Sequence, residues 1–411
     1  MHAIVPHHVE QHAEAASALW TLRHAATDQP HCAIHHLLRV EERLEAHLGV
    51  VRAGGGDGLA AACERLEQRG GPGELFVAAL LALEAGDRAL LDELVELARL
   101  QPETQAGLLG ALGWTAPRHL APFLRPWLAG DGFSRCLGLA ACSAHRSDAG
   151  AALGRLVEDP ESAVRGRALR LAGELGRADL CAAAAAAADE SHGPAALWGA
   201  WAAALLGDPA AGLPVLEQAA ENEPDGGPAL DAAVRAARRE TARAWIRGLG
   251  EDPGRGRLMV RALGILGDPA GVPWLLGRMA DPELARVAGE SFALLTGVDL
   301  AHDDLAADTP PDLALEPEAE LATDGLPADP DAGLPWPDPE LVRDWWERRG
   351  GMLTRGSRYI LGRPVDTEGC EAAWSQGLQR QRRAAAYELA LMRPDAKLRN
   401  WRARLLPRGN G

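Results

Sequence analysis

The sequence predicts an all-α protein built as a helical-repeat solenoid, and three observations lead to this prediction. Apolar residues make up 47% of the 411 residues while aromatic residues make up only 4%, and alanine supplies much of the apolar surface. Such a composition favours closely packed helices over sheets. A turn followed by an apolar helix recurs at intervals of 27 to 33 residues. The apolar residues after each turn fall on one helix face, which must be buried against a neighbouring repeat.

Residues 1–52 are predicted to form an N-terminal helical hairpin that caps the solenoid. Nine of the 13 histidines lie within the first 47 residues, and His31 and His35 would share a helix face, as metal ligands do. Because no His-Glu-x-x-His or Cys-x-x-Cys motif is present, we expect solvated or helix-capping histidines and no metal site. The glycines at 54, 55, 56 and 58 lack the Gly-Lys-Ser/Thr end of a phosphate-binding loop and predict a flexible connection.

Residues 59–298 are predicted to form the HEAT-like repeats, each of two helices. Asp87 and Asp268 stand at helix N-cap positions, and each is followed by apolar residues at offsets of 4, 7, 8 and 11. The second helix of a repeat opens at Asp-Pro pairs such as Asp159-Pro160, Asp252-Pro253 and Asp281-Pro282. The repeat markers are Gly86-Asp87, Trp114-Thr115, Ser147-Asp148, Arg177-Ala178-Asp179, Gly207-Asp208-Pro209, Glu240-Thr241 and Gly267-Asp268-Pro269.

Residues 299–338 are predicted to form an acidic, proline-rich linker. No Lys or Arg occurs from Val287 to Val342, and 13 acidic residues lie between Asp299 and Glu340. A segment of this composition buries too little apolar surface to offset its chain entropy, so we expect it to be largely disordered. It is also a candidate competitor that lies across the basic C-terminal region and occupies its ligand site.

Residues 339–411 are predicted to form a basic helical C-terminal unit. Residues 341–411 have a net charge of +8, and helical patterns extend from Pro339 to Arg349 and from Glu368 to Leu391. Tryptophan, tyrosine and arginine are enriched where partners bind, so this unit is the candidate partner surface. An alternative is a capping unit whose tryptophans close the end of the solenoid. The candidate partner-binding residues are Trp336, Trp345, Trp346, Arg358, Tyr359, Arg380, Arg382 and Arg383.

The charge of the chain argues against non-specific nucleic-acid binding. The net charge is −16, of which −11 belongs to residues 1–298, whereas binding to nucleic acid requires cations that neutralise phosphates. No nucleophile elbow or other catalytic constellation stands out, so we expect no catalytic residues, no cofactor and no enzyme activity. The six cysteines are scattered, so we expect reduced, buried thiols and a cytoplasmic protein. No targeting or membrane-spanning segment is expected.

Several stretches resemble a poorly characterised proteobacterial family of HEAT-repeat proteins, often encoded near type VI secretion genes. They include Gly267 to Leu276, Asp281 to Leu300, Leu334 to Pro339, Arg358 to Gly362 and Gln379 to Ala385. The family has no established activity, so the resemblance implies no catalytic residues. It implies a protein partner from the secretion apparatus, such as a spike protein, an effector or related cargo.

We therefore expect a non-enzymatic protein-binding scaffold, working as an adaptor or chaperone associated with type VI secretion. One alternative is an immunity protein whose acidic surface neutralises a secreted toxin. Another is a HEAT-like nucleic-acid-binding protein or DNA glycosylase, with Trp198, Trp201, Trp245 and Trp274 lining a groove. We expect neither nucleic acid nor membrane as a partner, and the sequence does not determine the oligomeric state.

Overall fold

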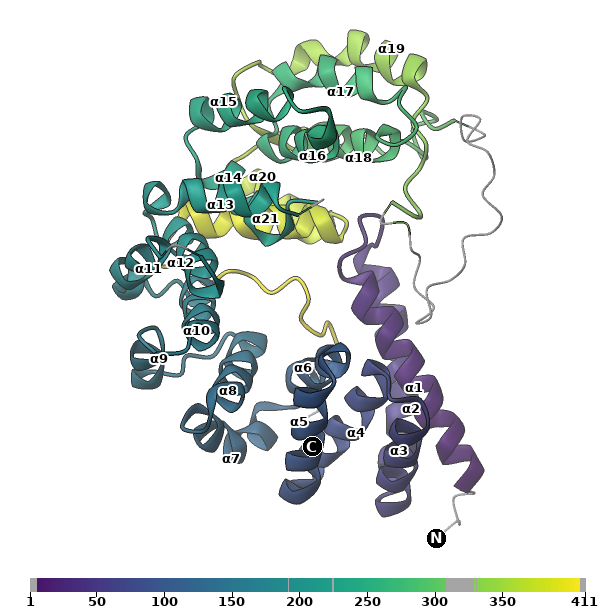
Figure 1. The fold of residues 1–411 in the computed structure, drawn as a ribbon. Coiled ribbons are helices and arrows are strands. Elements are labelled where there is room, and N and C mark those ends of the chain that lie inside the picture. The colour runs from purple at the N-terminus through teal and green to yellow at the C-terminus, as the bar shows by residue number, and fades with distance from the viewer. Residues whose placement is uncertain (1–5, 191, 224, 308–328, 330, 407–411) are drawn as a thin grey trace. The chain divides into compact units, whose positions relative to one another are not determined.

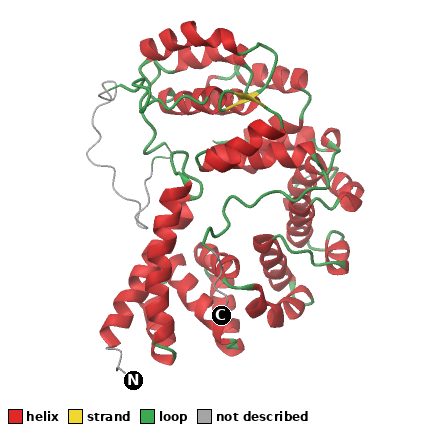
Figure 2. Cartoon of the chain, turned by 180° about the vertical axis from the view of Figure 1, so that it is seen from behind, coloured by secondary structure: helices red, strands yellow, loops and turns green. Residues whose placement is uncertain are grey.

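The computed structural model describes residues 6–190, 192–223, 225–307, 329 and 331–406. Within these residues the chain forms helices α1 to α21, short 3₁₀ turns and one small antiparallel hairpin. Helical coils therefore dominate the cartoon, and the hairpin is the small yellow element (Figure 2). The predicted fold class is confirmed: the protein is an all-α helical-repeat solenoid.

The chain divides into two compact units that do not follow the four predicted segments. Unit 1 contains residues 1–28, 32–171 and 402–411, and unit 2 contains residues 29–31 and 172–401. One boundary therefore lies inside the predicted repeats, within α10 (Ser162–Leu175). The last ten residues belong to the unit that holds the N-terminus, so unit 1 is built from both ends of the chain.

Unit 1 begins with the predicted N-terminal hairpin, whose two long helices α1 and α2 lie side by side (Figure 1). Its centre is aromatic: Trp20 stacks on Phe76 at 5.0 Å between ring centroids, and Trp114 meets Phe76 edge-on at 5.8 Å. The helices are α1 (Pro6–Ala26), α2 (Ile34–Ala53), α3 (Gly56–Arg69), α4 (Pro72–Ala85), α5 (Arg88–Leu100), α6 (Gln105–Trp114), α7 (Pro117–Leu128), α8 (Gly132–His145), α9 (Ala151–Leu156) and the start of α10.

Unit 2 continues the repeats and adds the C-terminal helices. Helix α21 packs against α14 and α12, and α19 packs against α17. The predicted C-terminal unit at 339–411 is thus largely part of the same compact body as the later repeats. The helices are α11 (Cys181–Ala188), α12 (Pro194–Leu205), α13 (Leu213–Glu221), α14 (Gly227–Ala236), α15 (Arg239–Leu249), α16 (Gly256–Leu266), α17 (Val272–Arg278), α18 (Ala285–Thr296), α19 (Pro339–Arg349), α20 (Thr367–Gln376) and α21 (Gln379–Met392).

The repeat markers place their side chains as the spacing predicts. The Asp87 carboxylate accepts a hydrogen bond from the Leu90 N–H at 3.1 Å, and Asp268 caps its turn through the Ala270 N–H at 2.9 Å. All eight apolar residues at the four predicted offsets are buried: Leu91, Leu94, Val95, Ala98, Val272, Leu275, Leu276 and Met279. The one-faced pattern and the aspartate caps therefore identify the buried side of these helices correctly.

A short hairpin interrupts the helical C-terminal region, which the sequence analysis did not predict. Strands β1 (Tyr359–Ile360) and β2 (Arg363–Pro364) join through Leu361 and Gly362, whose φ angles are +50° and +72°. The hairpin packs closely on the repeats, because the Tyr359 N–H donates to the Gly267 carbonyl at 2.8 Å. The single helix predicted from Glu368 to Leu391 is also divided at Gly377, between α20 and α21.

The predicted acidic linker lies mostly outside the described residues, at 308–328 and 330. The described residues on either side of it meet: the Ala307 N–H donates to the Trp336 carbonyl, and the Asp338 N–H donates to the Leu305 carbonyl, both at 2.8 Å. The described residues before and after this segment are therefore hydrogen-bonded to each other, and residues 331–401 belong to unit 2.

Candidate protein-binding site

The three candidate tryptophans lie against the repeats of unit 2. Trp345 and Trp346 on α19 are partly buried and meet the buried Phe292 ring edge-on, at 5.6 and 6.1 Å between ring centroids. Trp336 lies under the Arg286 guanidinium, with 4.7 Å from Cζ to the ring centroid. These contacts give all three residues a packing role inside unit 2.

Arg358, Tyr359 and Arg382 also make internal contacts. Arg358 donates to the Leu266 carbonyl at 3.0 Å and forms an ion pair with Glu388 on α21. Tyr359 accepts a hydrogen bond at its hydroxyl from the Thr354 N–H at 3.0 Å. Arg382 is buried, donates to the Trp374 carbonyl at 3.0 Å and stacks over the Trp374 ring. Arg382 is therefore inaccessible to a partner in this conformation.

Arg383 belongs to a buried ion network between α14 and α21. Asp231 accepts from Arg383 at 2.7 Å and from Arg235 at 2.9 Å, and Arg235 also donates to Glu388 at 2.7 Å. Burial alone would raise the pKa of Asp231, but Arg383 and Arg235 outweigh it and lower that pKa to about 2. Asp231 therefore stays charged at all ordinary pH values, and its ion pair with Arg383 holds α21 on α14.

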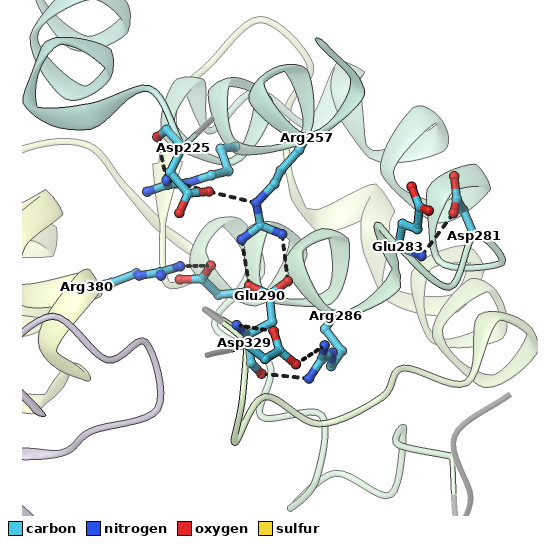
Figure 3. Close-up of polar contacts among 10 residues, drawn as sticks. Asp225, Arg257, Asp281, Glu283, Arg286, Glu290, Asp329 and Arg380 are labelled. Atoms are coloured by element: carbon cyan, nitrogen blue, oxygen red, sulfur yellow. Dashed lines mark hydrogen bonds and ion pairs between the residues drawn. The ribbon is translucent and has the colours of Figure 1, made fainter. Parts of the chain in front are cut away.

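The remaining candidate, Arg380, lies at the edge of a second cluster of charges in unit 2 (Figure 3). It forms an ion pair with Glu290 on α18 at 2.6 Å. A small cavity of about 40 Å³ lies between this pair and the buried network, and Arg261 on α16 also lines it. This cavity is large enough for a water molecule or two and too small for an organic substrate.

Arg257 and Arg286, here called the arginine pair, form the centre of this second cluster. Arg257 is the second residue of α16 and Arg286 the second residue of α18, so each occupies the same place in its repeat. Arg257 donates both of its Nη groups to the Asp331 carboxylate, at 2.7 and 2.8 Å. Arg286 donates to the Asp329 carboxylate at 2.5 Å and to the Asp331 backbone carbonyl at 3.1 Å. Two neighbouring repeats thus bind two acidic residues, Asp329 and Asp331, at the end of the predicted linker.

Asp331 is bound in the way that a binding site holds a carboxylate ligand, and not as an exposed surface ion pair. The Asp331 side chain is only 4% exposed, and a paired, two-bond contact with a guanidinium fixes both position and orientation. Arg257 also donates from Nε to Asp225 at 2.7 Å, as the dashed lines show (Figure 3). The pKa of the Arg257 guanidinium is raised, chiefly by its hydrogen bonds to Asp331. Asp225 therefore anchors Arg257 independently of Asp331.

The sequence analysis missed the arginine pair, although the sequence contains a signal for it. Arg257 and Arg286 each follow the aspartate of an Asp-Pro turn, Asp252 or Asp281, by five residues. Equivalent positions in neighbouring repeats lie next to each other on the solenoid surface. A search for charged residues at the repeat interval would have found the pair, whereas net charge over the whole segment conceals it.

The tryptophans proposed to line a nucleic-acid groove take structural roles. Trp201 is buried and donates from Nε1 to the Tyr387 hydroxyl at 3.1 Å. Trp245 donates to Glu221 at 2.8 Å, Trp274 lies beside Arg278, and Trp198 meets Trp201 edge-on. These indoles therefore pack or bind charges within unit 2.

The N-terminal histidines do not converge on a metal site in the part of the chain that is described. His12 and His47 lie 2.9 Å apart between their Nδ1 atoms, but among the described residues no three potential ligands cluster. All six cysteines are free thiols, of which Cys32, Cys142 and Cys370 are buried and the other three partly buried. No helix in the described ranges combines the length and apolar character needed to cross a membrane.

Comparison with known proteins gives no match. No family model, no curated protein and no solved structure is similar to this chain. The candidate site therefore rests on the geometry of the chain itself.

Proposed function

We propose that the protein is a non-enzymatic scaffold that binds an extended acidic segment of a partner protein on the arginine pair. The observation that supports this proposal is the two-bond contact of Arg257 with the almost fully buried Asp331. Repeat proteins use extended surfaces of this kind to bind partner chains. In this proposal, Asp329 and Asp331 occupy the site until a partner segment with the same spacing of carboxylates displaces them.

The class of partner follows from the chemistry of the pair. Two guanidinium groups from adjacent repeats donate to two carboxylates separated by one residue, and Arg286 also donates to the backbone carbonyl of the second acidic residue, Asp331. Phosphate groups would satisfy the same donors, but the charge of −11 over residues 1–298 disfavours a polyanion such as nucleic acid. An acidic peptide with two carboxylates brings far fewer negative charges than a polyanion, so the net negative charge of residues 1–298 disfavours it less.

The biological setting in this proposal is the cytoplasm, where the protein acts as an adaptor or chaperone for type VI secretion. A spike protein or effector would supply the acidic segment. This part of the proposal is supported by the family resemblance and not by the arginine pair.

The first experiment measures peptide binding by fluorescence anisotropy. The probe is a labelled peptide of residues 326–336, and the proteins are full-length wild type and the D329N/D331N variant. A tethered segment acts at an effective concentration of roughly millimolar, so removing its charges should tighten peptide binding at least about tenfold. Adding R257A/R286A to that variant should abolish binding, whereas R247A, an exposed arginine on α15, should not.

Equal affinity of wild type and D329N/D331N would reject the arginine pair as a ligand site. The scaffold role itself is tested by affinity capture from the native host with D329N/D331N and with the same variant carrying R257A/R286A. We expect D329N/D331N to recover a protein that contains an acidic segment, and we expect this protein to be missing when R257A/R286A is added. If both variants recovered the same proteins, the support for this function would be removed.

A further inference from the structure

A second surface, in unit 1, binds a basic segment of the chain, whereas the arginine pair in unit 2 binds an acidic one. The chain's last described residues, 402–406, form no helix or strand and lie against α1, α2 and α6 of unit 1. We call the five residues that bind them the tail-binding surface: Arg23, Asp28, Glu41, Glu45 and Trp114.

The centre of the tail-binding surface is the Glu41 carboxylate on α2, which is fully buried. One of its oxygens accepts two hydrogen bonds from Arg23, at 2.9 and 3.1 Å. The other accepts from the backbone N–H groups of Leu405 and Leu406, at 2.8 and 3.0 Å. Arg23 in turn donates to the Ala403 carbonyl at 2.9 Å. Glu41 and Arg23 together thus bind three backbone groups of a segment that is neither helix nor strand, whatever its side chains.

Side-chain selectivity comes from the two arginines of the tail, which are separated by one residue. Arg404 is 9% exposed, pairs with Glu45 at 3.0 Å and places its guanidinium 5.0 Å from the Trp114 ring centroid. Arg402 pairs with both oxygens of Asp28 at 2.7 Å. Glu41 and Glu45 are four residues apart on α2 and so share a helix face. The acidic groups of the surface are therefore placed to pair with two arginines that are separated by one residue.

The tail-binding surface needs an occupant of this chemistry. If residues 402–406 left it empty, one oxygen of the buried Glu41 would lose both of its donors, and a buried charge without partners is strongly unfavourable. Exchange for another segment with the same donors avoids this loss. Residues 402–406 form neither helix nor strand, so their release requires no helix to unfold.

We propose that the tail-binding surface is a recognition site for an extended Arg-x-Arg segment of a partner protein, which replaces residues 402–406. Asp28, Glu41 and Glu45 give the surface an acidic character that complements such a segment. The proposal adds a second, oppositely charged binding site to the scaffold role and does not depend on the arginine pair.

The test uses full-length protein and a labelled peptide of residues 400–407, read by fluorescence anisotropy. The R402A/R404A variant weakens the attachment of the chain's own tail, and its affinity for the peptide should exceed that of wild type at least about tenfold. Adding D28N/E45Q should reduce that affinity at least about tenfold, since both arginine contacts then lose their charge. The matched control is E42Q, an exposed acid beside Glu41, which should leave the affinity unchanged.

Three outcomes would overturn the proposal. The first is equal peptide affinity of wild type and R402A/R404A. The second is an E42Q effect as large as that of D28N/E45Q, or equal binding of a peptide with both arginines replaced by alanine, because either would mean non-specific attraction. The third is a concentration-dependent dimer of the wild type that R402A/R404A abolishes, because a second copy would then supply the segment. Failure of the acidic peptide at the arginine pair would reject only the proposed function and would leave this result unchanged.

Discussion

Replacing Arg235 by methionine should weaken the attachment of α21 to the repeats. Arg235 is 3% exposed at its side chain and joins Asp231 on its own helix, α14, to Glu388 on α21. Breaking a buried ion pair by removing one partner typically costs about 3–5 kcal/mol. Here Asp231 keeps Arg383 and Glu388 keeps Arg358, so we expect the lower end, about 3 kcal/mol.

Hydrogen exchange measured by mass spectrometry reports this loss locally, which is necessary because a chain with two compact units need not unfold in one step. A change of about 3 kcal/mol corresponds to roughly a hundredfold faster exchange through opening of α21. The matched control is R239A, whose solvent-exposed pair with Glu240 should leave exchange across α21 unchanged. If exchange across α21 were equal in the two variants, the network would not hold this helix in place, and the reasoning would be wrong.

Three further predictions concern the backbone, acid stability and thiol chemistry. Gly267 and Gly86 both have φ near +68°, but a Cβ at Gly267 would lie 2.3 Å from the Tyr359 carbonyl oxygen and one at Gly86 would meet nothing. In thermal unfolding, G86A should therefore cost about 1–2 kcal/mol and G267A clearly more, and equal costs would contradict the tight packing of the hairpin. Because the pKa of Asp231 is lowered from 3.8 to about 2, its stabilisation is complete above pH 3.8 and disappears as the pH falls through 2. In a D231N variant, hydrogen exchange across α21 should no longer show the acid dependence caused by Asp231. An unchanged pH profile in this variant would show that Asp231 is not its cause. Burial raises the pKa of Cys370 to about 12, so at pH 8 a thiol reagent should label it only after unfolding, and rapid labelling of the native protein would contradict this.

The repeat organisation could be predicted because its signals are local. Asp87 and Asp268 cap helix starts, and the apolar stripe after each one is fixed by helix geometry alone. The helical pattern predicted from Pro339 to Arg349 likewise coincides with α19.

The hairpin and the division between α20 and α21 depend on contacts that the local pattern does not contain. The hairpin is fixed by backbone groups far away in the sequence: the Tyr359 N–H donates to the Gly267 carbonyl, and the Leu361 N–H donates to the Leu294 carbonyl near the end of α18. A strand of two residues has no detectable alternation. The sequence therefore predicted helices around this region and left its centre undefined.

The candidate residues were chosen by side-chain type, and the structure reveals a different organising principle. Trp345, Trp346 and Arg382 have the composition of a binding surface, yet each packs within unit 2. Arg257 and Glu41 have ordinary composition, and they stand out only through what they bind: another part of the same chain. Sequence composition reports which side chains are available, and only tertiary structure reports which of them are already used.

The attachment of residues 402–406 to unit 1 has a consequence for the timing of synthesis. Arg23 and its acceptor at Ala403 are 380 residues apart in the sequence. At translation rates of about 5–20 residues per second, α1, which carries Arg23, emerges roughly 20 to 80 seconds before the segment that binds to it. During that interval Glu41 is exposed to any basic segment nearby, so a nascent chain offers its recognition surface before the finished molecule covers it.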